Sequence, residues 1–313
     1  MNFKKNALVI LVGPTGVGKT QLGLQLAEQL SGEIISADSR LFYRGMDIGT
    51  AKPTPAERAR VRHHLIDVAD PGEVLSLALF QRAAREAIED CHERGKLPFL
   101  VGGTGQYIRA VLEEWNIPPQ KPDLRLRLVL ETWADQIGQD GLHARLAVLD
   151  PAAAQIIDPR NIRRTIRALE VIFGTGRPFS TQRQQSGSPY SLLTIGLTRP
   201  RQELYDRIDQ RIEAMLVGGL VDEVNGLLTR GYRPEQSALS AIGYGEIADY
   251  LRGKSTLEEA VVFIKRYTRK FVRRQANWFK DSDPTIHWFR ANDETLNQAK
   301  ELVQQWVAGR IDE

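Results

Sequence analysis

Eight consecutive residues near the start of the chain have the types and spacing of a phosphate-binding loop. They match the pattern G-x-x-x-x-G-K-S/T and are Gly13, Pro14, Thr15, Gly16, Val17, Gly18, Lys19 and Thr20. Glycines at these positions let backbone N–H groups curl around an anion, and a following helix adds its positive N-terminal end. Lys19 supplies a point charge, and the Thr20 hydroxyl is suited to hold Mg²⁺. The pattern predicts that a polyphosphate binds here.

The position of a carboxylate at the end of a strand indicates which reaction the bound polyphosphate undergoes. Motor and switch NTPases hold Mg²⁺ with an Asp at the end of another strand. The apolar run at residues 97–101 ends instead in Gly102, Gly103 and Thr104, and Asp38 follows the apolar run at residues 33–37. This arrangement favours a transferase that acts on a bound acceptor over a machine that hydrolyses nucleotide.

The elements that position these residues follow from apolar patterns. Residues 7–12 are a continuous apolar run, as expected of a strand buried on both faces. Further strands are predicted at 33–37, 97–101 and 192–197, and helices at 19–30 and 80–94. Alternating strands and helices predict a P-loop NTPase-like parallel α/β sheet flanked by helices, whose ligands bind at the carboxyl ends of the strands.

The middle of the chain differs from both ends. Residues 122–177 have helical periodicity, many Arg and no convincing strand, and most of residues 202–306 also predicts helix. We therefore expect a discontinuous core domain, 1–120 and 190–313, interrupted by a helical insertion domain at 121–189.

Composition limits the class of protein. Hydrophobic residues are 42% and charged residues 26% of 313, and the net charge of +3 permits one basic face but excludes a polycation. The single cysteine, Cys91, excludes a disulfide framework and a thiolate zinc site. No apolar run approaches the ~20 residues that cross a bilayer, and the N-terminus lacks the pattern of a secretory signal. We expect a soluble cytoplasmic protein without a membrane partner.

Several stretches spread over nearly the whole chain resemble the tRNA dimethylallyltransferases, also called tRNA isopentenyltransferases. Besides the phosphate loop, they are SADS at 36–39, GMDIGTAKP at 45–53, HHLID at 63–67, VGGT at 101–104, NIRR at 161–164, RALE at 167–170, AIGY at 241–244, and RRQ at 273–275 ahead of Trp278 and Phe279. Many proteins share the phosphate loop. The run at 45–53 and the Gly-Gly-Thr strand end, in this order, are far more specific.

The resemblance implies transfer of a dimethylallyl group from dimethylallyl diphosphate to N6 of the adenosine 3′ to the anticodon in tRNA. It implies Asp38 as general base, Thr104 as hydrogen-bond partner of the target base, and Arg211 as a diphosphate ligand. The chemistry agrees, because the N6 lone pair is delocalised and a base that takes its proton assists attack. The larger demand is to stabilise the leaving diphosphate, which backbone N–H groups, Lys19 and Mg²⁺ can supply. We expect the protein to be a monomer.

The resemblance also implies a set of tRNA contacts. These are Asp38, Ser39, Arg40, Leu41, Thr104, Arg125, Arg163, Arg164, Thr165, Ile166, Arg167, Arg273 and Arg274. The insertion domain is thereby expected to contact tRNA.

A basic helix is predicted at residues 265–274, where six of ten residues are basic and none is acidic. Lys265, Arg269 and Arg273 form one column, and Arg266, Lys270 and Arg274 form the next. Val262, Phe263, Tyr267 and Phe271 are expected to pack elsewhere. Such a face suits a phosphate backbone, and the alternative is a solvated charged helix.

Other functions and roles stay open at this point. A small-molecule P-loop kinase shares the loop and an Asp after the second strand, and an adenylate isopentenyltransferase acting on free nucleotide shares the chemistry. Asp38 is alternatively a turn or cap residue. The pair His63 and His64 resembles a metal site only superficially, because adjacent residues point to different faces and no other His or Cys is near in the sequence. A structural hydrogen-bonding role is favoured for His64.

Overall fold

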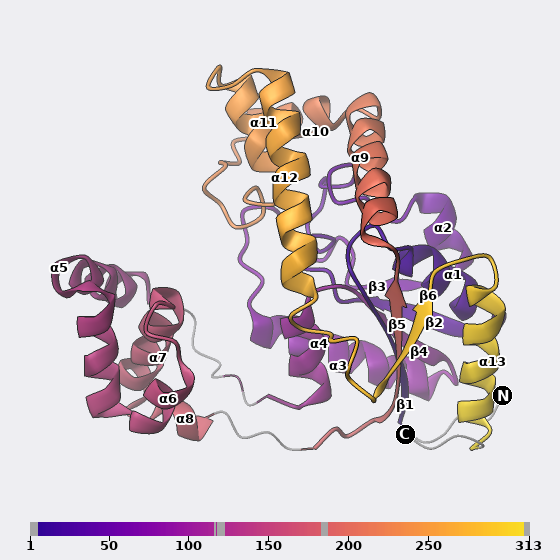
Figure 1. The fold of residues 1–313 in the computed structure, drawn as a ribbon, viewed down its shortest axis with the longest axis horizontal. Coiled ribbons are helices and arrows are strands. Elements are labelled where there is room, and N and C mark those ends of the chain that lie inside the picture. The colour runs from indigo at the N-terminus through magenta and orange to yellow at the C-terminus, as the bar shows by residue number, and fades with distance from the viewer. Residues whose placement is uncertain (1–5, 116, 118–122, 183–186, 310–313) are drawn as a thin grey trace. The chain divides into compact units, whose positions relative to one another are not determined.

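The computed structural model describes residues 6–115, 117, 123–182 and 187–309, and the chain divides into two compact units (Figure 1). The core unit joins Met1–Leu112 to Ser188–Glu313, and the helical unit is Glu113–Gly187. The domain boundary expected between residues 120 and 121 falls outside the described residues. No helix in the described ranges combines the length and the apolar content of a membrane span.

The core unit is built on a parallel sheet, and its described strands have the order β3-β2-β4-β1-β5-β6. They are β1 Ala7–Val12, β2 Gly32–Ser36, β3 His63–His64, β4 Leu97–Val101, β5 Ser191–Thr198 and β6 Ile286–Arg290. The four predicted strands are confirmed to within one residue at each end, and so is the predicted α/β class.

Strand β1 shows why a run without polar residues is needed at the centre of the sheet. Its six side chains are all buried. Because successive side chains point to opposite faces, Val9 and Leu11 belong to one hydrophobic cluster, whereas Leu8 and Ile10 belong to another. Each face therefore receives part of the core from the same strand.

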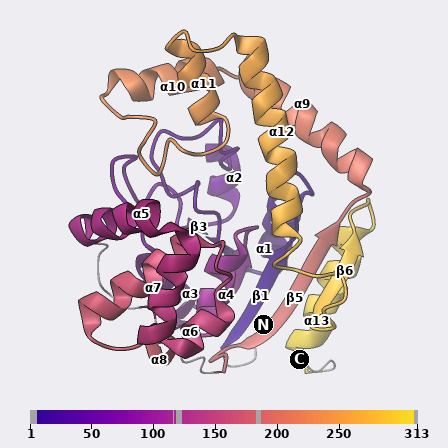
Figure 2. The same ribbon diagram turned by 60° about the vertical axis from the view of Figure 1, so that its left-hand side comes forward.

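Helices cover both faces of this sheet (Figures 1 and 2). Helices α1 (Lys19–Gln29) and α13 (Thr295–Val307) pack on one face, and α3 (Leu77–Glu93) and α4 (Gly105–Leu112) pack on the other. The short helix α2 (Pro55–Arg60) precedes β3. The helices predicted at 19–30 and 80–94 are confirmed as α1 and α3.

Four further helices gather beyond the carboxyl end of β5 (Figure 1). They are α9 (Arg201–Val217), α10 (Leu220–Thr229), α11 (Tyr244–Leu251) and α12 (Leu257–Gln275). Helix α12 begins with a capping box, in which the Thr256 side chain and that of Glu259 each bind the other residue's backbone N–H. These helices stand where the ligands of an open α/β sheet bind.

The prediction that residues 202–306 are mostly helix is confirmed, and strand β6 is an element in this segment that the sequence did not predict. Its sequence, IHWFR, has only one buried residue, Ile286, and so lacks the continuous apolar run of a central strand. The segment is a strand because it pairs in parallel with β5, a contact that its own sequence does not encode.

The helical unit contains α5 (Leu124–Leu149), α6 (Pro151–Ile156), α7 (Ile162–Thr175) and α8 (Phe179–Gln182). Helix α5 is kinked at Gly138, whose φ of 73° is a left-handed conformation. The unit has its own hydrophobic cluster, in which Leu142 and Leu146 of α5 pack with Leu169 of α7. The helical character predicted for residues 122–177 is confirmed.

Candidate active site

The phosphate loop, residues 13–20, joins the carboxyl end of β1 to the start of α1. Gly13 has a φ of 141° and Gly18 a φ of 112°, which side chains with a Cβ rarely adopt. A Cβ on Gly13 would also lie 2.6 Å from the carbonyl oxygen of Leu197. Gly18 is the N-cap of α1 and no side chain caps this terminus. The first N–H groups of α1 are therefore available to an anion.

Lys19 is half-buried at the first position of α1, and its Nζ donates a hydrogen bond to the carbonyl of Pro14 at 2.8 Å. Burial lowers the pKa of this ammonium group from its usual 10.5 to about 8. The negative charge of Asp38 raises the pKa, and the positive charge of Arg211 lowers it further. A bound anion would favour the charged form and raise this pKa again.

A cavity of about 540 Å³, the donor cavity below, opens beside the phosphate loop. It is lined by Lys19 and Thr20 of α1, Asp38 after β2, Gly103 after β4, and Arg211 of α9. The carboxyl ends of three parallel strands thus meet at this cavity, as the sequence predicted for the ligand site. Thr20 is exposed, and no hydrogen bond of the described residues engages its hydroxyl.

A second cavity of about 310 Å³, the acceptor cavity below, adjoins the first. Both cavities are lined by Thr15, Asp38, Thr50 and Arg211. Of the predicted base and tRNA contacts, the acceptor cavity brings together Asp38, Ser39, Arg40, Thr104 and Arg274. Leu41 lines the donor cavity instead, and Arg273 is exposed on α12.

Asp38 stands where the two cavities meet. Its Oδ1 accepts a hydrogen bond from the backbone N–H of Arg40 at 3.0 Å, so the alternative interpretation as a turn residue is confirmed. No described group donates to Oδ2, which leaves one carboxylate oxygen to face a ligand. Because the turn holds Oδ1 in place, it also fixes the direction in which Oδ2 points.

Two arginines of α9 approach the phosphate loop and its surroundings. Arg211 is largely enclosed, and its Nη2 donates to the carbonyl of Thr50 at 3.3 Å. Burial lowers the pKa of its guanidinium, while Asp38 raises it. Arg207, one helical turn earlier, donates from Nε to the carbonyl of Gly16 at 3.1 Å and lines the donor cavity. Sequence reasoning assigned a role only to Arg211.

Gln275 holds the site together but received no role from the sequence. Its Oε1 accepts from the backbone N–H of Thr15 at 2.9 Å, and its Nε2 donates to the carbonyl of Gly103 at 3.0 Å. The residue is 5% exposed. The only available signal was its place in the RRQ motif at 273–275.

Glu223 of α10 is a second residue that sequence reasoning missed. Its carboxylate accepts hydrogen bonds from the backbone N–H groups of Asp47, Ile48 and Gly49 at 2.8, 2.8 and 3.1 Å. It also accepts from the hydroxyl of Tyr244 at 2.5 Å. Burial, followed by the charge of Glu223, raises the pKa of Tyr244. This carboxylate therefore fixes the loop that carries Thr50 into both cavities.

The basic helix is confirmed as α12, but the two predicted columns have different environments. Lys265 forms an ion pair with Glu213 at 2.9 Å, and Arg269 forms one with Asp209 at 2.5 Å, both on α9. Both cations thus have carboxylate partners within the core unit, and contact with RNA phosphates stays a prediction for them. Arg266, Lys270 and Arg274, in the other column, are exposed.

The apolar side chains of this helix also depart from expectation. Phe271 lines the acceptor cavity. Val262, Phe263 and Tyr267 were expected to pack elsewhere but are 63%, 39% and 40% exposed. The buried positions of α12 are instead Ala260, Ile264, Val272 and Gln275.

In the helical unit, only some of the predicted tRNA contacts are accessible. Arg125 and Arg163 are exposed, and Arg164 is half-buried. Arg167 is half-buried and lies 3.4 Å from Glu170. Thr165 and Ile166 are 1% and 5% exposed. The prediction that these last two side chains contact tRNA is corrected, because the apolar face of α7 is buried in the cluster of this unit.

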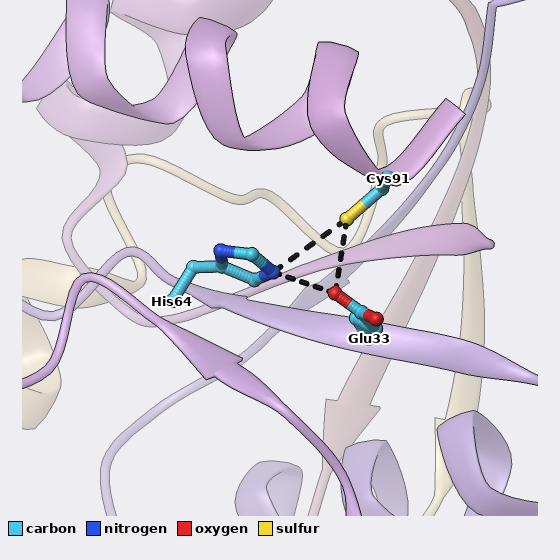
Figure 3. Close-up of side chains that lie close together, drawn as sticks. All are labelled: Glu33, His64 and Cys91. Atoms are coloured by element: carbon cyan, nitrogen blue, oxygen red, sulfur yellow. Dashed lines mark hydrogen bonds and ion pairs between the residues drawn. The ribbon is translucent and has the colours of Figure 1, made fainter. Parts of the chain in front are cut away.

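Glu33 of β2, His64 of β3 and Cys91 of α3 lie together at one edge of the sheet (Figure 3). Nε2 of His64 is 2.7 Å from Oε2 of Glu33, so the hydrogen-bonding role of His64 is confirmed, although Cys91 is nearer than its sequence position suggested. Burial, followed by the charge of Glu33, raises the pKa of the Cys91 thiol to about 12, which disfavours a thiolate ligand.

Arg94 makes this cluster unsuitable as a metal site. Burial alone would raise the pKa of Glu33, but hydrogen bonds from Arg94 and His64 outweigh it and lower the pKa to about 2. The Arg94 guanidinium binds both carboxylate oxygens and would repel a cation. We interpret the cluster as a structural tie among β2, β3 and α3.

Comparisons with known proteins show the family of the chain. The family model described as IPP transferase matches residues 41–282. The tRNA dimethylallyltransferase of Roseiflexus sp. (strain RS-1) is 52% identical over 301 residues, which are 96% of this chain and 98% of that relative. The crystal structure of a tRNA isopentenylpyrophosphate transferase from Bacillus halodurans is similar with a TM-score of 0.73 and 44% identity, covering 97% of this chain and 98% of that one. A eukaryotic dimethylallyltransferase acting on tRNA is similar with a TM-score of 0.83 and 27% identity, covering 98% and 81%. The resemblance inferred from the sequence is confirmed, and the chain belongs to the IPP transferase family.

Proposed function

We propose that this protein transfers a dimethylallyl group from dimethylallyl diphosphate to N6 of the adenosine 3′ to the anticodon in tRNA. The observation that carries the proposal is the pair of adjoining cavities that share Asp38 and Arg211. The donor cavity combines the phosphate loop with apolar side chains such as Ile34 and Ile66, which suits a diphosphate with a short hydrocarbon chain. The acceptor cavity has room for one base.

The reaction breaks the C1–O and N6–H bonds, and it forms the C1–N6 bond and a bond between the base and the released proton. The N6 lone pair attacks C1 of the dimethylallyl group, the C1–O bond breaks, and diphosphate leaves with the bonding electrons. One N6 proton is then surplus and is taken up by a base. Products are N6-isopentenyladenosine in tRNA and diphosphate.

Asp38 is the proposed base and Thr104 the proposed partner of the adenine. Both line the acceptor cavity, and only Asp38 also lines the donor cavity. Oδ2 of Asp38 is free to accept the N6 proton as the new bond forms. Because the target base is stacked in a loop, it must leave the stack to reach Asp38, at a cost that is lower in single-stranded RNA.

The leaving diphosphate is the larger electrostatic problem, and the cations converge on it. Lys19, Arg207 and Arg211 line the donor cavity together with the start of α1. These fixed positive groups stabilise the charge that develops as the C1–O bond lengthens. The allylic carbon becomes cation-like in the same step, and apolar side chains of the lining such as Ile34 and Ile66 offer it no nucleophile.

Mg²⁺ is the proposed cofactor, and the residues present suit it. The exposed Thr20 hydroxyl and the Asp38 carboxylate line the same cavity as the phosphate loop, and oxygen ligands are those that Mg²⁺ prefers. Thr20 would hold the ion together with the diphosphate. The bound Mg²⁺ would neutralise negative charge on the leaving diphosphate.

The tRNA surface is proposed to include exposed basic residues from both units. In the core unit these are Arg273 and Arg274, and in the helical unit Arg125 and Arg163. Phosphate contacts of this kind position a substrate without reading its sequence. Both cavities are lined by residues of one chain, so we propose that a monomer is sufficient for activity, which light scattering of the active enzyme tests.

Label transfer separates this proposal from its alternatives. The enzyme is incubated with Mg²⁺ and labelled dimethylallyl diphosphate, and with tRNA or AMP as acceptor. Label in tRNA but not in AMP is expected, because AMP lacks the RNA backbone whose phosphates the basic surfaces are proposed to bind. Transfer to AMP alone indicates an adenylate isopentenyltransferase. Phosphate transfer from ATP to an alcohol, with no prenyl transfer, indicates a kinase.

A further inference from the structure

Helix α12 gives one of its faces to the acceptor cavity. The lining residues are Ile264, Thr268, Phe271 and Arg274. Their spacing of three or four positions places them on one side of a helix with about 3.6 residues per turn. A residue one position before or after each of them lies about 100° to either flank.

One flank is closed against α9. Lys265 and Arg269 each follow a cavity-lining residue by one position, and they pair with Glu213 and Asp209. The guanidinium of Arg269 also lies 5.2 Å from the ring centre of Tyr205. These contacts satisfy the charges of this flank within the protein.

The other flank is open. Phe263, Tyr267 and Lys270 each precede a cavity-lining residue by one position, and all are exposed. Arg266 and Arg274 border the same strip and are also exposed. Among the described residues, none of its three cations forms an ion pair with a carboxylate.

The two rings in this strip are parallel to each other. The centroids of Phe263 and Tyr267 are 6.0 Å apart with an interplanar angle of 16°, as expected for positions i and i+4. Single exposed apolar side chains are ordinary on a protein surface. A stacked aromatic pair among three unpaired cations, at the edge of a cavity, is a combination found in binding surfaces for single-stranded nucleic acid.

We infer that Phe263 and Tyr267 form a stacking platform for unpaired bases of the RNA substrate, next to the cavity that takes the target adenosine. This inference rests on the proposed function, because it adds a contact to the same substrate. When one nucleotide leaves the stack of a loop, its neighbours lose a stacking partner. The rings replace that partner, while Arg266, Lys270 and Arg274 follow the phosphates.

The test compares ring removal with charge removal in the full-length protein. Phe263→Leu and Tyr267→Leu keep an apolar side chain with good helix propensity but remove the aromatic face. We expect each to weaken binding of an anticodon stem-loop by roughly 5- to 150-fold where its ring stacks on a base, with an unchanged slope of log affinity against log salt. Lys270→Gln should instead reduce that slope by roughly 0.7 to 0.9. Tyr267→Phe should retain affinity, since it keeps the ring.

Two controls make the result specific. Val262→Ala removes an apolar side chain that is 63% exposed but lies on the opposite side of α12 from the cavity, and it should leave RNA affinity unchanged. A fully paired RNA hairpin with a short closed loop should bind wild type and both Leu variants alike, because it offers no unstacked bases. Affinity for dimethylallyl diphosphate should be the same in all variants.

The opposite result is easily recognised. Unchanged stem-loop affinity in the double variant Phe263→Leu/Tyr267→Leu, accompanied by a lower melting temperature, would overturn the inference and show that the rings pack against protein. Failure of the proposed function looks different. In that case wild type transfers no label to tRNA, whereas the effect of the rings on RNA binding is still measured directly.

Discussion

Gln275, the last residue of α12, binds the backbone N–H of Thr15 in the phosphate loop, 260 positions away in the chain, through its Oε1 at 2.9 Å. The other atom of the same amide, Nε2, donates to the carbonyl of Gly103. One buried side chain therefore connects the basic helix, the phosphate loop and the segment that leads to Thr104. A neutral amide suits this place because it offers a donor and an acceptor at once.

Removing this amide should weaken both the fold and the donor site. Gln275→Leu leaves the buried carbonyl of Gly103 without its partner, at about 1–3 kcal/mol, and it also removes the acceptor of the partly buried Thr15 N–H. Denaturant titration should show a lower free energy of unfolding, and calorimetry a weaker affinity for dimethylallyl diphosphate. Gln304→Leu, at an exposed position of α13, is the matched control. Equal effects of the two substitutions would contradict a bridging role.

Lys19 should make diphosphate binding depend on pH. Its pKa in the folded protein is lowered to about 8, so the ammonium that attracts the anion is lost above that pH. The affinity for dimethylallyl diphosphate should therefore be constant well below pH 8, begin to fall as pH 8 is approached, and fall above it by up to about tenfold per pH unit. Lys19→Ala should bind weakly and show no such decline. Calorimetric titrations at several values between about pH 7 and 9.5 measure both effects.

The lowered pKa of Lys19 affects the stability of the free protein in the opposite direction, because stability increases with pH where diphosphate affinity falls. The unfolded chain holds its Lys proton up to about pH 10.5, whereas the folded protein releases it near 8. Between these values the unfolded state binds more protons, so this group raises the free energy of unfolding as pH increases. The penalty for burying the charge is fully present below pH 8. Lys19→Met should remove this contribution in denaturant titrations.

Asp38→Asn tests the proposed base. The amide keeps the oxygen that accepts from Arg40 N–H but no longer takes a proton, so the turn is preserved and proton transfer is not. Single-turnover transfer to tRNA should slow by on the order of 10²–10⁴, with tRNA affinity changed only a few-fold. A variant with a near-normal single-turnover rate would assign Asp38 to the turn alone.

The fold was predictable where local pattern decides structure. Strands β1 and β4 are continuous apolar runs, and the phosphate loop is set by glycines whose conformations need no distant partner. Strand β6 and the pairing of Arg269 with Asp209, 60 positions apart, depend on which segments meet in the folded protein. Individual candidate residues such as Asp38 could be predicted because they lie in a recognisable motif, SADS at 36–39.

Residues that act through long-range contacts were not predictable in the same way. Glu223 has the sequence environment of an ordinary helix residue, and nothing around it indicates three backbone donors contributed by residues 47–49. Exposed rings on α12 were misjudged for a related reason. Helical periodicity shows which residues share a face, but the partner of each face is set by tertiary packing.

Arg269→Gln should affect stability more than RNA binding. Its ion pair with Asp209 is partly exposed, with 38% and 26% of the two side chains accessible, so its loss should cost at most about 1 kcal/mol. The salt dependence of tRNA binding should stay as in wild type. Arg266→Gln, an exposed member of the neighbouring column, should show the reverse pattern. Filter-binding assays at several salt concentrations and thermal melts distinguish the two.

Glu223 should act on substrate binding through the loop at residues 45–52. Three backbone N–H groups converge on its carboxylate, and hydrogen bonds to a charged acceptor contribute about 1.5–3 kcal/mol. Glu223→Gln replaces one acceptor oxygen by a donor and removes the charge, so the loop loses its anchor. Thr50, whose carbonyl accepts from Arg211, would then no longer hold that guanidinium toward the donor cavity.

Kinetics separate this positioning role from general destabilisation. We expect Glu223→Gln to raise the KM for dimethylallyl diphosphate more than it lowers kcat, while Tyr244→Phe, which removes one bond to the same carboxylate, should have a smaller effect of the same kind. Both variants are assayed well below their melting temperatures, so that loss of folded protein does not contribute. A proportional fall in the amount of active enzyme, with KM unchanged, would show that Glu223 supports only the fold. A selective rise in KM requires that the carboxylate set the position of Thr50 and, through it, of Arg211.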